Sequence, residues 1–167
     1  MSTRRGRPAS ELRRTAYRVA LESFRRMPVR VRRSIVRAGT PNYTVGAVCS
    51  VVKDDTVLLL RQRHRDGWTL PGGLLDRGED CDAAIRRELA EELRLEVDPG
   101  LPVTTLVEPH LRRVDIVYRI DAYDGMEPRP RGEALEVGWV RPCDLGPDSL
   151  ETAQILARLL QARGGVL

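Results

Sequence analysis

Aromatic side chains are scarce in this sequence, at only 4% of 167 residues. Leucine, valine, isoleucine and alanine must therefore fill the core. A chain of this length folds as about one domain and can bury a sizeable core. Apolar residues at 41% and charged residues at 31% are ordinary proportions for a soluble globular protein.

Cysteine and long apolar runs are also lacking. The three cysteines, Cys49, Cys81 and Cys143, are scattered and do not form the closely spaced Cys or Cys/His pairs of a zinc site. Such a sparse, odd count fits a reducing compartment. No stretch approaches the ~20 apolar residues of a membrane span, and no apolar segment follows Arg4-Arg5 to complete an export signal. We therefore predict a cytoplasmic protein without a transmembrane segment.

Lysine is nearly absent, because Lys53 is the only one among 28 basic residues. The arginines are distributed unevenly. Residues 1–40 hold twelve arginines against two glutamates, a net charge of +10, so the rest of the chain carries −6 of the total of +4. This pattern predicts an Arg-rich N-terminal helical extension over residues 1–40, followed by one domain over residues 41–163.

The extension has two possible roles. An amphipathic helix can pack on its own domain or on the partner in a homodimer, and this interpretation is favoured. The alternative is contact with nucleic acid or with an anionic membrane surface.

Hydrophobic periodicity predicts the order of helices and strands. Helices are expected over residues 11–26, 28–37, 80–94 and 149–162, and strands over residues 43–52, 56–62, 103–108, 114–123 and 135–140. The Pro/Gly/Arg segment 124–132 is predicted to be a loop too polar to pack, and Pro71-Gly72-Gly73 a tight loop. This order indicates an α/β fold, with a mixed central sheet and helices on both sides.

Three carboxylates share one face of the helix predicted over 80–94. A helix turns ~100° per residue, so Glu88, Glu91 and Glu92 fall within ~100° of arc. Like charges at this spacing repel, which a bound Mg²⁺ would relieve because it prefers a few carboxylates with water and phosphate oxygens. The alternative is a solvated acidic surface.

The spacing around these carboxylates is more specific than the cluster alone. The segment resembles the Nudix box, Gly-x5-Glu-x7-Arg-Glu-U-x-Glu-Glu-x-Gly-U, where U is aliphatic. Eight of its nine specified positions match: Gly73, Glu79, Arg87, Glu88, Leu89, Glu91, Glu92 and Leu95. Arg94 stands where the family usually has glycine, so we expect an altered helix end. With the lead-in 66–73 and the strand 136–140, the resemblance covers about residues 43–160.

The resemblance implies a Nudix α/β/α sandwich and hydrolysis of a nucleoside diphosphate linked to another group. It also implies that Glu91, Glu92 and the backbone carbonyl of Gly72 bind Mg²⁺, with Mn²⁺ as an alternative. Glu88 would orient or deprotonate the attacking water, or bind a second metal ion.

Other carboxylates have supporting roles by the same resemblance. Arg87 would pair with Glu79 and hold the preceding loop against the helix. Some members of the family recruit a further glutamate from a later loop, and Glu133 and Glu136 are the candidates here. Glu133 follows the loop 124–132, which would let it swing toward a metal ion.

Substrate contacts are less defined than the box. Arg61, Arg63 and Arg65 alternate along a predicted strand and would share a face, where Arg61 and Arg63 could bind phosphate. Trp68 could stack on a base. A MutT-like triphosphatase, an ADP-ribose pyrophosphatase and a nucleotide-sugar hydrolase all remain open, with ADP-ribose or a related dinucleotide favoured. Two other classes are a nucleotide- or RNA-binding module without turnover and an RNA-directed pyrophosphohydrolase.

Overall fold

The N-terminal part of the chain forms two helices. The computed structural model describes residues 8–162, and the chain divides into two compact units, Met1–Asn42 and Tyr43–Leu167. The first unit contains α1 (Pro8–Arg26) and α2 (Val29–Gly39), so both helices predicted there are confirmed. α1 begins three residues earlier than predicted, because proline is tolerated in the first turn of a helix.

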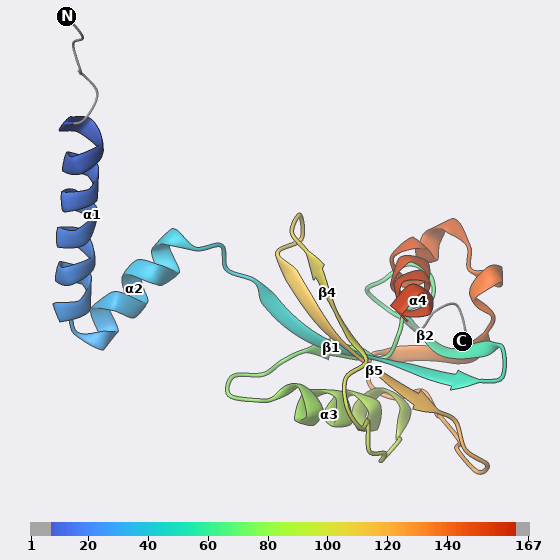
Figure 1. The fold of residues 1–167 in the computed structure, drawn as a ribbon. Coiled ribbons are helices and arrows are strands. Elements are labelled where there is room, and N and C mark those ends of the chain that lie inside the picture. Colours follow the sequence, from blue (N-terminus) through green and yellow to red (C-terminus); the bar gives the residue numbers. More distant parts are fainter. Residues whose placement is uncertain (1–7, 163–167) are drawn as a thin grey trace, which may run out of the picture. The chain divides into compact units, whose positions relative to one another are not determined.

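The second unit is built on a mixed sheet of six strands (Figure 1). The strands are β1 (Thr44–Lys53), β2 (Thr56–Gln62), β3 (Gly72–Leu74), β4 (Thr104–Glu108), β5 (Arg113–Asp121) and β6 (Ala134–Val140). Their order is β4-β5-β1-β2-β6, and β3 pairs with β1. β1 and β5 are parallel, whereas the other pairs are antiparallel.

One long helix covers each face of this sheet. Helix α3 (Cys81–Leu93) lies on one face and α4 (Leu150–Ala162) on the other (Figure 1). Two short 3₁₀ helices, Pro142–Asp144 and Pro147–Ser149, precede α4. The predicted α/β/α sandwich with a mixed central sheet is therefore confirmed.

Strand β2 shows why the sheet needs both helices. Leu58 and Leu60 face the core under α3, whereas Val57 and Leu59 face the core under α4. All four are fully buried, because successive side chains of a strand point to opposite faces and both faces are covered.

The sheet opens between β1 and β2, and this opening positions the site. The two strands pair at Val52↔Val57 and Lys53↔Thr56, whereas the first half of β1 pairs with β3 instead. The prediction that Pro71-Gly72-Gly73 is only a tight loop is therefore wrong. Gly72 and Gly73 belong to a short strand, which their sequence could not indicate because it has no apolar alternation.

The C-terminal end of α3 is regular, so the expectation of an altered end is wrong. Arg94 itself takes the left-handed conformation that the usual glycine would adopt, with φ of 58°. Its N–H donates to the carbonyl of Ala90, as in the common αL helix ending. The backbone is therefore preserved, at the steric cost of a left-handed arginine.

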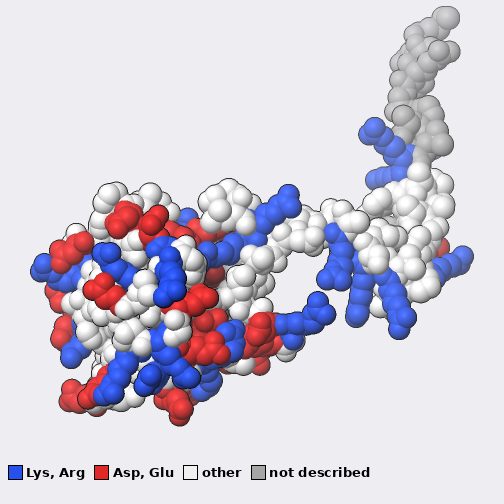
Figure 2. Space-filling model, turned by 180° about the vertical axis from the view of Figure 1, so that it is seen from behind, with Lys and Arg blue, Asp and Glu red and all other residues white. Residues whose placement is uncertain are grey.

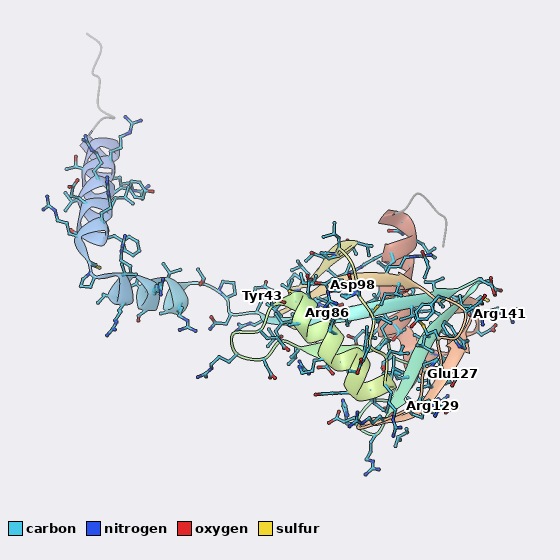
Figure 3. The ribbon with its side chains drawn as sticks, turned by 90° about the horizontal axis from the view of Figure 1, so that it is seen from below. Tyr43, Arg86, Asp98, Glu127, Arg129 and Arg141 are labelled. Atoms are coloured by element: carbon cyan, nitrogen blue, oxygen red, sulfur yellow. The ribbon has the colours of Figure 1, made fainter. Side chains whose placement is uncertain are left out.

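The segment 124–132 is a mostly exposed loop, as predicted, but its backbone is tied to α3. The N–H groups of Arg129 and Arg131 donate to the carbonyls of Leu93 and Glu92, both at 2.9 Å. Figure 3, seen from the α3 side, shows Glu127 and Arg129 near this end of the helix. The segment therefore satisfies helix carbonyls that would otherwise lack partners.

Candidate active site on helix α3

Helix α3 is fixed at its start and along one face. The side chain of Asp80 accepts a hydrogen bond from the N–H of Ala83 at 2.9 Å, which caps the first turn. Ile85, Leu89 and Leu93 are fully buried against the sheet. This apolar stripe fixes the rotation of the helix and therefore the direction of its carboxylates.

Glu92 is the most enclosed of these carboxylates, with 6% of its surface exposed. Its Oε2 accepts a hydrogen bond from the N–H of Gly72 at 3.0 Å, and its Oε1 accepts one from the side chain of Gln62. Burial raises the pKa of Glu92 to about 7, and the nearby charge of Glu88 adds to the rise. The carboxylate thus sits where a positive charge would be strongly favoured.

The two glycines of β3 permit close approach to β1 on one side and to a carboxylate of α3 on the other. A Cβ on Gly72 would lie 2.2 Å from the carbonyl oxygen of Ala47, and Gly72 has a φ of 139°. A Cβ on Gly73 would lie 2.1 Å from Oε1 of Glu88. A side chain at Gly72 would therefore separate β3 from β1, and one at Gly73 would displace the carboxylate of Glu88.

Arg87 connects the helix to the loop before it. Its guanidinium donates two hydrogen bonds to Glu79, both at 3.0 Å, and one to the carbonyl of Leu74 at 3.2 Å. A further hydrogen bond of 2.8 Å reaches Oε1 of Glu88. The hydrogen bonds from Arg87 hold the pKa of Glu79 below its ordinary value. The predicted pair of Arg87 and Glu79 is therefore present, and the same arginine also orients Glu88.

Glu91 completes the carboxylate face but is mostly solvated. Its side chain is 62% exposed and lies 3.7 Å from the Arg87 guanidinium. Across residues 8–162, no three acidic, histidine or cysteine side chains converge closely enough to hold a metal ion. Glu88 accepts a hydrogen bond from Arg87, whereas Glu92 accepts hydrogen bonds from Gly72 and Gln62. The carboxylates therefore lie on one face of the helix but do not converge on a common position.

The chemistry of this donor set nevertheless suits a hard divalent cation. All the donors are oxygens, which Mg²⁺ and Mn²⁺ prefer. Burial raises the pKa of Glu92, and a bound cation would favour its charged form. Glu91 is free to turn toward Glu92, because only a distant contact with Arg87 holds it.

The two later glutamates lie in different places. Glu133 is exposed, with its Oε2 3.2 Å from Nδ1 of His64. Glu136 pairs with Arg61 across β2 and β6, on the α4 face of the sheet and therefore away from α3. Of the two, Glu133 is the better placed to approach the carboxylates, although the anchored segment before it limits the swing that we expected.

The arginines considered for substrate binding do not share a strand face. Arg61 lies on β2, but β2 ends at Gln62, so Arg63 and Arg65 lie in the following turns. The expectation that the three alternate along one strand is wrong. Arg61 stacks over the ring of Trp68 at 4.9 Å, and Trp68 is half-buried against the core under α4. A base could stack on that face of Trp68 only if Arg61 moved.

Gln62 is the site residue that sequence reasoning missed. It is buried at the end of β2 and donates to Glu92, 30 positions later in the chain. Gln62 alternates with Leu58 and Leu60 and therefore lies on the α3 face of β2. This alternation could have identified Gln62 from the sequence as a residue that faces the helix. The identity of its partner depends on how α3 packs on β2, which the local sequence does not specify.

The whole domain matches a known family. The NUDIX domain family matches residues 42–161, which is most of the chain. The chain belongs to the Nudix family. A MutT-like protein from Streptomyces ambofaciens is 33% identical over 129 residues, covering 75% of this chain and 80% of that protein. The family match and this relative show that the chain is a Nudix pyrophosphohydrolase.

Two further relatives indicate the range of the family. An NAD-capped RNA hydrolase, NudC, from Klebsiella pneumoniae is 30% identical over 100 residues, which are 59% of this chain and 39% of that enzyme. The solved structure of an ADP-ribose pyrophosphatase from Streptococcus suis has a TM-score of 0.60 and 26% identity. That comparison covers 74% of this chain and 92% of the other. The Nudix chain thus resembles enzymes with different nucleotide substrates.

Proposed function

We propose that residues 41–163 form a divalent-metal-dependent Nudix domain that cleaves the phosphoanhydride bond of a nucleoside diphosphate linked to a second group. The observation that carries this proposal is the packing of Glu88 and Glu92 on one face of α3 against the glycines of β3. Burial, with a smaller contribution from the charge of Glu88, raises the pKa of Glu92, and a bound cation would favour its charged form.

Glu91, Glu92 and the carbonyl of Gly72 are the proposed metal ligands. Bound there, Mg²⁺ would neutralise charge on the phosphate oxygens and lower the pKa of water. Mn²⁺ would serve in the same role because its ligand preferences are similar. Gln62 and the N–H of Gly72 hold Glu92 in place, so the chain supplies one fixed ligand and one adjustable ligand.

Glu88 is the proposed acceptor of the proton from the attacking water. Its carboxylate has one oxygen bound to Arg87, which leaves the other oxygen available to orient water. Arg87 and Glu79 act as positioning residues, since they hold the loop 74–79 against α3. Phosphoryl transfer depends mainly on positioning and charge stabilisation, which this arrangement can provide.

ADP-ribose or a related dinucleotide is the proposed substrate. The resemblance to an ADP-ribose pyrophosphatase supports this choice. Arg63 is exposed and forms no ion pair among the described residues, so it can reach a phosphate more freely than Arg61. A second candidate substrate is NAD-capped RNA, on the strength of the similarity to NudC.

A substrate panel tests this proposal. ADP-ribose, NADH, nucleoside triphosphates, nucleotide sugars and NAD-capped RNA would each be assayed with Mg²⁺ and then with Mn²⁺. We expect turnover of a dinucleotide, lost in chelator and reduced at least about tenfold in Glu91→Gln. Glu96→Gln is the matched control, because Glu96 is an exposed glutamate just beyond α3. Equal rates in both variants would refute the metal role of Glu91.

A further inference from the structure

The two N-terminal helices carry apolar side chains that no other described residue of their unit covers. On α1, Tyr17 and Val19 are 67% and 60% exposed, and on α2, Val29, Ile35 and Val36 are each about half exposed. No residue of α2 is buried. A unit of 42 residues is close to the lower limit at which a chain builds a core of its own, so these exposed apolar side chains favour a partner.

Helix α2 is divided into an apolar and a basic half. With ~100° per residue, Val29, Val31, Ile35 and Val36 fall within one half of the helix, which also contains Arg32. Arg30, Arg33 and Arg37 occupy the other. A helix of this kind, with low overall hydrophobicity and arginines opposite apolar side chains, is typical of segments that lie in the surface of a lipid bilayer.

A groove between the two helices adds a second observation. Phe24 from α1 and Val29 and Val36 from α2 line its apolar floor, and Arg32, Arg33 and Arg37 surround it, in a volume of about 550 Å³. Within the described residues, the Nε of Arg32 is buried there without a hydrogen-bond partner. An unpartnered guanidinium N–H beside an apolar groove fits a phosphate attached to a hydrocarbon chain.

We propose that the N-terminal unit binds the surface of membranes that contain anionic phospholipid. The apolar half of α2 enters the boundary of the acyl chains, and the arginines contact headgroup phosphates. Figure 2 shows the arginines that project from these helices. No helix within residues 8–162 is long and apolar enough to cross a membrane, so the contact is with the surface.

Charge distinguishes this partner from two others. Pairing of two N-terminal units would bring together two segments of net charge +10, which repel each other. Nucleic acid would satisfy the arginines but leave Tyr17, Val19 and Ile35 in water. An anionic bilayer satisfies both requirements at once, because it offers phosphate and hydrocarbon within one interface.

The test is co-sedimentation of the full chain with vesicles. Vesicles of phosphatidylcholine and phosphatidylglycerol in equal parts would be compared with vesicles of phosphatidylcholine alone. We expect binding only to the anionic vesicles. A combined substitution of Arg30, Arg33 and Arg37 by Gln should weaken it on the order of 100-fold, since each basic residue near such a surface contributes roughly fivefold. Combined substitution of Arg77, Arg112 and Arg158 by Gln, which are exposed in the other unit, is the control and should have little effect.

A second pair of variants tests insertion rather than simple charge attraction. Ile35→Ser with Val36→Ser keeps the charge and should weaken binding at least about tenfold, whereas Ile35→Leu with Val36→Leu should retain it. Three results would overturn the proposal: no binding to anionic vesicles, equal binding by the Ser and Leu variants, or binding of the chain to a short single-stranded RNA but not to vesicles. Hydrolase activity should be unchanged in all these variants.

Discussion

Replacing Glu92 by Gln removes a carboxylate that the fold holds at a pKa of about 7, against an ordinary value of 4.5. Between these two pH values the folded protein binds more protons at this position than the unfolded chain does. The free energy of unfolding of the metal-free protein therefore falls as the pH rises from about 4.5 to about 7. Above that window the cost of the buried charge is fully present.

The size of this cost follows from the shift. Each pKa unit corresponds to about 1.4 kcal/mol, so a rise from 4.5 to about 7 costs up to about 3 kcal/mol at alkaline pH. Glu92→Gln avoids this cost. Gln62 can reverse its amide and accept a hydrogen bond from the new side chain, so the contact with Gly72 and the contact with Gln62 can both persist.

The assay is urea unfolding in chelator at several pH values. Glu92→Gln should be more stable than the wild type by about 2–3 kcal/mol above pH ~8, and the difference should shrink to below about 1 kcal/mol near pH ~5. Glu96→Gln serves as the control for the loss of a negative charge. Saturating Mg²⁺ should stabilise the wild type preferentially, because a ligand that binds only the folded state adds to its stability. The argument is refuted if Glu92→Gln is less stable at alkaline pH, or if its stability depends on pH as steeply as that of the wild type.

Three further substitutions or reactions test the local structure. Gly72→Ala should destabilise the protein by at least about 3 kcal/mol in urea unfolding, because its Cβ would collide with the carbonyl of Ala47. A variant as stable as the wild type would contradict the β1–β3 pairing. Arg94→Gly should raise the unfolding free energy by about 0.5–1 kcal/mol, because glycine removes the left-handed strain but adds entropy to the unfolded chain. An unchanged or lower value would count against the strained helix end. Cys49 should resist alkylation at pH ~8 in the native protein while exposed Cys143 reacts, because burial raises the pKa of Cys49 to about 12. Mass spectrometry of the labelled peptides measures this order, and faster labelling of Cys49 would contradict the expectation.

The sequence was sufficient for most of the fold. The β-branched and apolar runs that became β1, β2 and β5 were found because buried strands leave long apolar segments. Helix α3 was found because its apolar residues recur at helical spacing. The same spacing placed Glu88, Glu91 and Glu92 on one face, and the structure retains that arrangement.

Features that depend on distant contacts were not predictable in the same way. β3 is stabilised by pairing with β1 rather than by its own sequence. The partnership of Gln62 with Glu92 and the hydrogen bonds from Arg129 to α3 depend on how separate segments pack. Arg94 shows the converse case: the residue departs from the expected glycine, but the surrounding helix end imposes the usual conformation.

Titration with Mn²⁺, followed by electron paramagnetic resonance, tests the central claim most directly, because it detects the cation that the carboxylates of α3 are proposed to hold. The wild type should show a saturable site, and the combined substitution of Glu91 and Glu92 by Gln should weaken it by more than about tenfold. The single substitution Glu96→Gln should leave it unchanged. Equal Mn²⁺ affinity in the wild type and the double variant would contradict the assignment of the metal site to this face of α3.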